Sequence, residues 1–317
     1  MPFKNAAPWL AECLKTIQFQ TYTRWELLAV DDGSEDESAS IVREFAIEDE
    51  RISVLTNKKS GIISALQTGI LHIQGEYITR MDADDLMPPD KLETLFNAAV
   101  KNPGSLVTGK VKYFGKKAVS RGYTEYEKWL NSCVKNNDFH RFMYRECAVA
   151  SPNWLLPSFL LGPTQCFEEL SYPEDYHLIL KLYAARVPFV GIDKITHLWR
   201  HHESRTSLNS NDYSQQRFFE LKINFWCDTD WHERRPVVVL GEGVKADLTI
   251  DVLERRGIHF TRVGLTEHKG IKPVAYLDEV MNPQILITVW PATSQRISMI
   301  AYLLKRGWIE GDNFWFL

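Results

Sequence analysis

Hydrophobic positions in the first hundred residues follow two alternating patterns. Short apolar runs have the length of buried strands at residues 26–30, 52–55 and 76–81. Apolar residues three or four positions apart predict helices over residues 7–19 and 61–73. Ser34 and Glu37 fit a capping box that opens a helix ending at about residue 45, and another helix is predicted to begin at residue 88. This alternation predicts a mostly parallel α/β sheet, with ligands at the carboxyl ends of its strands.

The remaining sequence divides into two stretches. Residues 101–230 are less regular and predict a strand over 105–114 and helices ending near 186 and 226. Alternation returns after residue 234, with strands predicted at 237–240, 259–263 and 285–289 and helices at about 244–256 and 294–306. We therefore expect a first domain over residues 1–230 and a small βαβ domain over 234–317.

Composition narrows the class of protein. The 317 residues carry 37 basic and 41 acidic side chains, and a net charge of −4 argues against bulk nucleic-acid binding. No apolar run reaches about 18 residues and no signal peptide is evident, so we expect no transmembrane helix. Five scattered cysteines without a CxxC pair predict reduced, buried thiols and a cytoplasmic protein.

Three acidic groups are candidates for chemistry. Residues 82–85 (Asp-Ala-Asp-Asp) follow a strand, where bunched carboxylates favour a Mg²⁺ or Mn²⁺ ion shared with a diphosphate. Residues 31–34 (Asp-Asp-Gly-Ser) could accept hydrogen bonds from a nucleobase or ribose, and Glu174-Asp175 could supply a general base. Each group also has a structural explanation, as a solvated loop, a turn before a capped helix, or acids at a helix start.

Taken in order, these segments resemble the family 2 glycosyltransferases, which are inverting, nucleotide-sugar-dependent enzymes of the GT-A fold. The similarity covers roughly residues 1 to 225. The segments that carry it are residues 2–5, 20–27, 30–34, 57 with 61–69, 75–85, 173–175, 199–202 and 204–207. One DxD motif would be weak evidence, whereas the ordered set is specific. The resemblance implies a nucleotide-binding half over about residues 1–100 and an acceptor half over about 101–230.

The resemblance also implies roles for individual residues. It implies a nucleotide-binding set of Pro2, Phe3, Asn5, Asp31, Asp32 and Asp82. Asp84 and Asp82 are implied for the metal site, with Asp84 as the direct ligand and Asp82 nearer the ribose. His201 or His202 matches a further metal or phosphate contact in some relatives, and Arg200 could contact phosphate or brace the loop. Asp175 matches the catalytic base, with Glu174 beside it.

The implied activity is transfer of a sugar from a UDP- or dTDP-sugar to a hydroxyl of a glycan or lipid-linked acceptor in bacterial surface polysaccharide synthesis. A Mn²⁺ or Mg²⁺ cofactor and at most peripheral membrane association go with it.

Two features depart from the family. The apolar strand that precedes the Pro-x-x-Asn turn is missing, which should leave backbone unpaired and open the core. Lys4 stands where an aromatic residue often stacks on the base, with Phe3 beside it.

The last domain resembles the start of a dinucleotide-binding unit at Gly241-Glu-Gly243, with Ala246 in the third glycine position. Its second strand ends in Val263-Gly264 without an acid for a ribose hydroxyl, so we expect no NAD. Two other functions stay open. A sugar-1-phosphate nucleotidylyltransferase would share the sheet and the metal carboxylates, and a non-catalytic nucleotide-binding scaffold would fit the missing strand.

Overall fold

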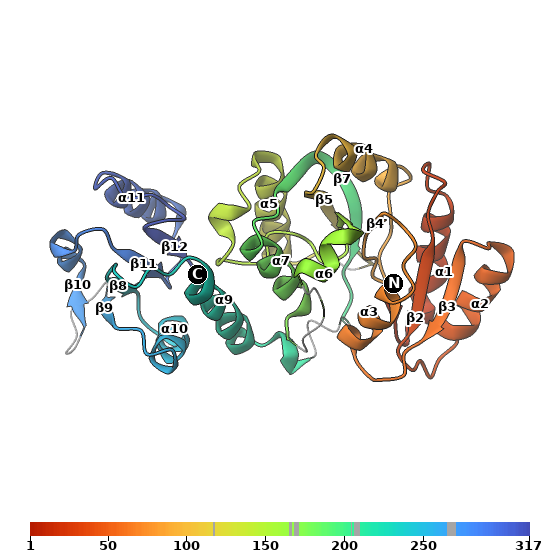
Figure 1. Ribbon diagram of the computed structural model, residues 1–317, viewed down its shortest axis with the longest axis horizontal. Coiled ribbons are helices and arrows are strands. Elements are labelled where there is room, and N and C mark those ends of the chain that lie inside the picture. The colour runs from red at the N-terminus through yellow and green to blue at the C-terminus, as the bar shows by residue number, and fades with distance from the viewer. Residues whose placement is uncertain (117, 165–166, 168–170, 204, 206–209, 265–270) are drawn as a thin grey trace. The chain divides into compact units, whose positions relative to one another are not determined.

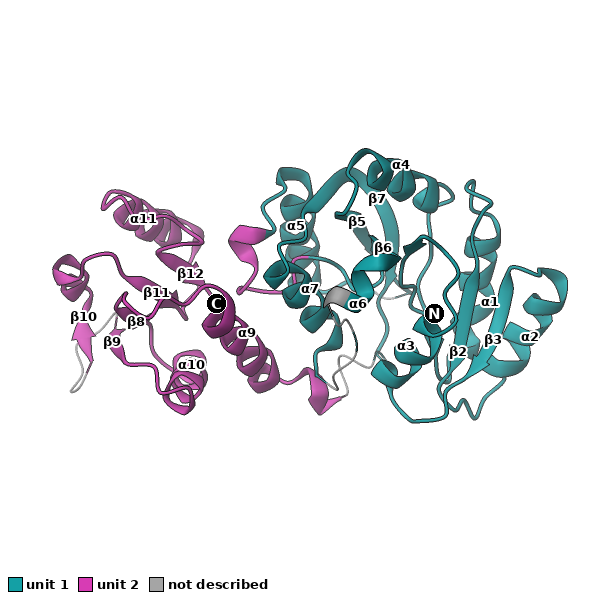
Figure 2. Cartoon of the chain, viewed as in Figure 1, with its two compact units in different colours: residues 1–139, 149–209 teal, residues 140–148, 210–317 magenta. Residues whose placement is uncertain are grey.

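The computed structural model describes the chain except residues 117, 165–166, 168–170, 204, 206–209 and 265–270 (Figure 1). The described residues form two compact units, residues 1–139 with 149–209 and residues 140–148 with 210–317 (Figure 2). The division falls near residue 210, whereas the sequence placed it at 230–234. Helix α9 (Gln215–Thr229) therefore lies in the second unit, where Trp226 packs edge-on against Trp315 at 5.6 Å between ring centroids.

A three-stranded parallel sheet begins the first unit. It has the order β1-β2-β3 and consists of β1 (Pro2–Phe3), β2 (Leu27–Asp31) and β3 (Ile52–Thr56). The helices of this region are α1 (Ala7–Gln18), α2 (Ser38–Glu48) and α3 (Ile62–Ile70). The order of these strands and helices confirms the predicted alternation. Helix α1, for example, buries the residues of its apolar stripe.

The predicted capping box is wrong. Helix α2 begins at Ser38, and its N-cap residue Glu37 makes no side-chain capping bond. The Ser34 hydroxyl instead accepts a hydrogen bond from the Asn5 amide at 3.2 Å. The Ser34 amide donates to Asp31 Oδ1 at 2.9 Å. Ser34 therefore joins the loops after β1 and β2, and this tertiary role replaces the local cap.

A second sheet completes the first unit, with the order β4-β6-β5-β7. Its strands are β4 (Tyr77–Ile78), β5 (Leu106–Phe114), β6 (Trp154–Pro157) and β7 (Phe189–Arg200). Its helices are α4 (Lys91–Lys101), α5 (Arg121–Asn136), α6 (Leu161–Thr164) and α7 (Glu174–Ala184). Strand β6 runs antiparallel to both neighbours, and β5 runs parallel to β7. The single sheet predicted from sequence is thus two sheets, the second one mixed.

Close packing joins α5 to β7. A Cβ atom added at Gly191 would lie 1.9 Å from the Val134 carbonyl oxygen, so only glycine permits this approach. The sequence did not predict α5, β6 or β7. Strand β7 is polar through its middle and its apolar residues do not alternate cleanly, which hid it from a search by periodicity.

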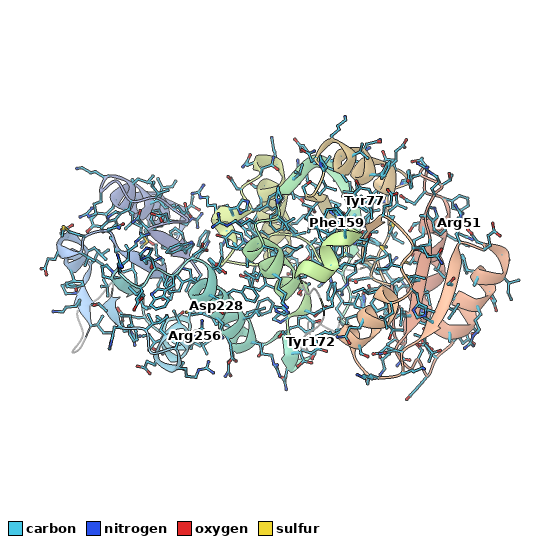
Figure 3. All side chains as sticks on the ribbon, viewed as in Figure 1. Arg51, Tyr77, Phe159, Tyr172, Asp228 and Arg256 are labelled. Atoms are coloured by element: carbon cyan, nitrogen blue, oxygen red, sulfur yellow. The ribbon has the colours of Figure 1, made fainter. Side chains whose placement is uncertain are left out.

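Strand β1 is short, and a cavity lies beside it. Met1 donates to the Leu28 carbonyl at 2.8 Å, and β1 pairs with β2 from Pro2 onward. This cavity has a volume of about 660 Å³, and its walls include Ile73, Leu28 of β2, and Tyr77 of β4. Tyr77 is labelled in Figure 3, as is Arg51, whose guanidinium lies 3.8 Å from the Trp25 ring centroid. The acidic residues of the candidate site do not line this cavity.

The second unit is a five-stranded parallel sheet with the order β10-β9-β8-β11-β12. Its strands are β8 (Val237–Leu240), β9 (Phe260–Gly264), β10 (Lys272–Pro273), β11 (Gln284–Ile287) and β12 (Phe314–Phe316), and its helices include α10 (Val244–Arg255) and α11 (Thr293–Leu304). The strand order reverses at β8, as in doubly wound sheets. Asp228 of α9 pairs with Arg256, at the end of α10 (Figure 3).

Four short 3₁₀ helices complete the described structure, at His140–Phe142, Ser158–Leu160, Asn211–Tyr213 and Val274–Glu279. In the part of the chain that the structure describes, no helix is both long and apolar enough to cross a membrane. Cys13, Cys133, Cys147 and Cys227 are buried, while Cys166 lies outside the described residues.

Candidate active site

The loop after β4 carries the Asp-Ala-Asp-Asp sequence. Asp82 accepts a hydrogen bond at Oδ1 from Arg80 Nε at 2.9 Å, and its side chain is 21% exposed. Asp84 Oδ2 lies 2.7 Å from His202 Nε2, and its side chain is 24% exposed. Two carboxylates of the motif thus reach solvent, whereas Asp85 is buried. Asp82 and Asp84 are therefore the members of the motif that a ligand can reach.

His202 and its neighbours fix Asp84. Burial alone would raise the pKa of Asp84, but the hydrogen bond to His202 and the charges of Arg205 and His202 outweigh it and hold that pKa below its usual value. The His202 ring stacks on Trp9, with 4.1 Å between ring centroids. Sequence reasoning did not identify Trp9 or Arg205, and only the place of Arg205 in the 204–207 segment offered a signal.

A buried chain of polar groups supports the loop from the inside. Asp85 Oδ2 lies 2.9 Å from His197 Nε2, and His197 Nδ1 lies 3.0 Å from Lys91 Nζ. Lys91 also donates to the Pro152 carbonyl at 2.7 Å. Burial, together with the charges of Asp84 and Asp82, raises the pKa of Asp85 well above its usual value. Burial lowers the pKa of Lys91 to about 7, so burial shifts both Asp85 and Lys91 toward their neutral forms.

Arg200 braces the same loop through three contacts. Its amide donates to Asp85 Oδ1 at 2.7 Å, its Nε donates to the Asp84 carbonyl at 2.5 Å, and its Nη2 pairs with Glu12 at 2.7 Å. Of the two alternatives for Arg200, the bracing role is thus the one with visible contacts. A phosphate contact stays a prediction.

The two adjacent histidines differ in their surroundings. His201 packs on Tyr123 at 4.5 Å between ring centroids, and its Nδ1 is buried without a hydrogen-bond partner among the described residues. The structure thus brings His202, and not His201, to the acidic loop. Ser204, Thr206 and Ser207 of the predicted segment lie outside the described residues.

The acidic pair at the end of β2 is held by a second set of bonds. Asp32 accepts from Asn57 Nδ2 at 2.5 Å and from the Gly61 amide at 3.0 Å. Gly61 has φ of +106°, a conformation that favours glycine. Asp31 accepts from the Ser34 amide, as described above. Both carboxylates therefore have fixed orientations at the carboxyl end of β2, where the sequence predicted a nucleotide contact.

The residues of β1 lie in different environments. Phe3 is 3% exposed and belongs to the hydrophobic core, so its ring is not available to stack on a base, and Pro2 is buried beside it. Asn5 has φ of +50° and accepts from the Glu35 amide at 2.8 Å. Burial, with the nearby charge of Arg80, lowers the pKa of the Met1 amine to about 5. Strand β1 therefore contributes buried residues to the core and, through Asn5 after it, a contact to the loop after β2.

The third acidic pair begins helix α7. Asp175 accepts from the Tyr176 amide at 2.8 Å. Burial and the adjacent Glu174 charge raise the pKa of Asp175 to about 7, although the Arg80 charge acts in the opposite direction. Glu174 is buried and accepts from Arg80 Nη1 at 2.9 Å. Arg80 therefore contacts both Asp82 and Glu174, which brings the acidic groups at residues 82–85 and 174–175 together.

The carboxylates suit a divalent cation only in part. Oxygen ligands of this kind fit Mg²⁺ or Mn²⁺. Over the described ranges, no three His, Cys, Asp or Glu side chains converge closely enough to hold a metal by themselves. A cation at Asp84 would thus take its remaining ligands from water and from a bound diphosphate, which is the usual mode for Mg²⁺ with phosphate substrates.

Comparison with known proteins agrees with this geometry. Residues 1–152 match the sequence profile of the family described as Glycosyl transferase family 2. Glycosyltransferase GlyG of Streptococcus pneumoniae serotype 4 is 28% identical over 226 residues, which cover 68% of this chain and 74% of GlyG. The UDP-Glc:alpha-D-GlcNAc-diphosphoundecaprenol beta-1,3-glucosyltransferase WfgD of Escherichia coli is 29% identical over 188 residues, which cover 57% of this chain and 67% of WfgD.

Two solved structures share the fold. S. aureus TarS in complex with UDP-GlcNAc has a TM-score of 0.58 at 17% identity, over 80% of this chain and 70% of that one. The mannosyltransferase PcManGT of Pyrobaculum calidifontis, in complex with GDP-Man and Mn²⁺, has a TM-score of 0.51 at 18% identity, over 72% of this chain and 61% of that one. The predicted GT-A fold is confirmed, and the match to the Glycosyl transferase family 2 profile extends over residues 1–152.

Proposed function

We propose that the protein is a metal-dependent, inverting glycosyltransferase that moves a sugar from a nucleoside diphosphate to a hydroxyl group. Asp175 is the catalytic base, and Asp82 and Asp84 lie on the donor side. The observation that carries this assignment is the pair of ion contacts from Arg80, which tie the donor-side Asp82 to the residue next to Asp175. A base beside the donor is what a single displacement requires.

The reaction needs one proton acceptor and one stabilised leaving group. The acceptor hydroxyl oxygen forms a bond to the anomeric carbon while the bond from that carbon to the diphosphate oxygen breaks, which inverts the centre. The hydroxyl proton goes to the Asp175 carboxylate, and a pKa of about 7 leaves that carboxyl ionised above neutral pH. A divalent cation at Asp84 would supply neutralisation of the charge that develops on the diphosphate.

The named relatives support a donor and an acceptor class. TarS binds UDP-GlcNAc, and WfgD is named for transfer of glucose from UDP-Glc to a diphosphoundecaprenol-linked sugar. PcManGT was solved with Mn²⁺. We therefore propose a UDP- or dTDP-sugar as donor, a glycan or lipid-linked acceptor, Mn²⁺ or Mg²⁺ as the cofactor, and a role in bacterial surface polysaccharide synthesis. The site of action would be the cytoplasm, at the inner face of the membrane.

Calorimetric titration tests the donor site. UDP, dTDP and GDP are titrated with and without Mn²⁺ into the wild type, Asp84→Asn and the distant control Arg51→Met. We expect one nucleotide to bind in a Mn²⁺-dependent way, with at least about tenfold loss in Asp84→Asn and no change in the control. Absence of binding by all three nucleotides would contradict the proposal, and binding without any sugar transfer would favour a non-catalytic nucleotide-binding scaffold. Consumption of a nucleoside triphosphate with release of pyrophosphate would instead favour a nucleotidylyltransferase.

A further inference from the structure

Arg80 lies between two acidic groups that are far apart in the sequence. It follows β4 in the chain, whereas Glu174 is the first residue of α7 and lies 94 positions away. Nε donates to Asp82 Oδ1 and Nη1 donates to Glu174 Oε1, both at 2.9 Å. The arginine side chain is 9% exposed and that of Glu174 is 2% exposed. Two different nitrogens of one buried guanidinium therefore bind two different carboxylates.

We propose that Arg80 is a positioning residue that couples the donor-side carboxylate Asp82 to the start of the base-bearing helix α7. This inference rests on the proposed function and adds to it a mechanical and electrostatic link between donor binding and the base. Because the guanidinium divides its charge between Asp82 and Glu174, a change at one carboxylate alters how firmly Arg80 holds the other.

Burial makes this link strong enough to matter. The contact between Arg80 and Glu174 is buried and far less screened than a surface pair, whereas Asp82 is partly exposed and open to a ligand. If Glu174 loses its charge, more of the Arg80 charge acts on Asp82. Arg80 then competes more effectively with a bound donor for the Asp82 carboxylate, and the affinity for the nucleotide falls. A Glu174 that only begins a helix would have no such effect.

Lysine cannot replace arginine in this role. A lysine amine is a single point charge, whereas the guanidinium is a rigid plane whose separate nitrogens reach the two carboxylates at once. Arg80→Lys therefore keeps the charge and loses the bridge. Arg80→Met alone removes a charged partner of the buried Glu174 and should lower the stability of the protein. Arg80→Met combined with Glu174→Gln removes both charges and avoids that problem.

The experiment measures the affinity for UDP in the presence of Mn²⁺, with dTDP and GDP as alternatives, in the full chain. Glu174→Gln is made in the wild-type, Arg80→Lys and Arg80→Met backgrounds, and thermal unfolding checks that each protein is folded. Arg51→Met serves as a matched control, because Arg51 pairs with Asp49 at 2.7 Å in the same unit and does not contact the acidic loop in the bonds described for it.

We expect Glu174→Gln to weaken nucleotide binding about twofold to tenfold when Arg80 is present, which is the lower part of the coupling range found between contacting residues. We expect no effect of the same substitution in the Arg80→Lys background or in Arg80→Met. An equal effect of Glu174→Gln in all three backgrounds, or none in the wild type, would overturn the link while leaving the proposed function intact. If the wild type binds none of the three nucleotides, the proposed function fails and the link fails with it.

Discussion

Catalysis should depend on pH near neutrality, because Asp175 must lose its proton before it can accept another. Burial and the Glu174 charge raise the pKa of Asp175 from 3.8 to about 7. At that value the carboxyl is about one-tenth ionised at pH 6, about one-half at pH 7 and about nine-tenths at pH 8. The rate should therefore rise about fivefold from pH 6 to pH 7 and less than twofold from pH 7 to pH 8.

Glu174→Gln tests the direction in which the Glu174 charge shifts the pKa of Asp175. Glutamine keeps an oxygen that can accept from Arg80 Nη1 but removes the negative charge next to Asp175. The pKa of Asp175 should fall, so the acidic limb of the rate profile should move to lower pH and the ratio of the rate at pH 6 to that at pH 8 should rise. The assay is release of UDP from UDP-sugars with water as acceptor, measured at saturating donor.

Stability provides an independent test of the same pKa. Between pH 4 and pH 7 the folded state keeps a proton on Asp175 that the unfolded chain has released, so the free energy of unfolding should fall as pH rises through this range. Asp175→Asn removes the contribution of this carboxyl to the pH dependence of the free energy of unfolding. The variant should be more stable than the wild type at pH 8, by on the order of a few kcal/mol, but not at pH 4. A flat rate profile between pH 6 and pH 8, or a limb that moves upward in Glu174→Gln, would refute the reasoning.

Two further predictions concern packing. Gly191→Ala should lower the free energy of unfolding by at least about 3 kcal/mol in denaturant titrations, because the new Cβ would lie 1.9 Å from the Val134 oxygen. Gly122→Ala, whose nearest neighbour is 3.9 Å away, should change it by less than about 1 kcal/mol. Lys91→Met should cost about 3 kcal/mol, because it leaves the buried groups around His197 without their donor; a loss below about 1 kcal/mol would show that Lys91 is not an essential donor.

Local patterns were sufficient for the first hundred residues. The apolar stripe of α1 and the runs at β2 and β3 lie where periodicity placed them, because each element buries one regular face. The same reasoning failed at β6 and β7. Strand β6 is only four residues long and wholly buried, so it shows no alternation, and β7 carries charged residues in its middle.

The candidate site was predicted by residue type but not by contact. The acidic groups were visible because several carboxylates follow strands or begin a helix. Their partners were not visible, since Arg80 meets Glu174 across 94 positions and His197 meets Asp85 across 112. Such pairs depend on the tertiary approach of distant segments. Phe3 shows the converse, because a residue at a motif position lies in the core rather than toward a ligand.

The most direct test of the account separates binding from turnover at Asp175. Calorimetry measures the Mn²⁺-dependent affinity for UDP, and UDP release from UDP-glucose and UDP-N-acetylglucosamine measures turnover, each for the wild type and Asp175→Asn. We expect the affinity to stay within about twofold while turnover falls at least about a hundredfold, which is the contribution expected of a general base. Turnover that persists in Asp175→Asn at the wild-type rate would contradict the assignment of Asp175 as the catalytic base.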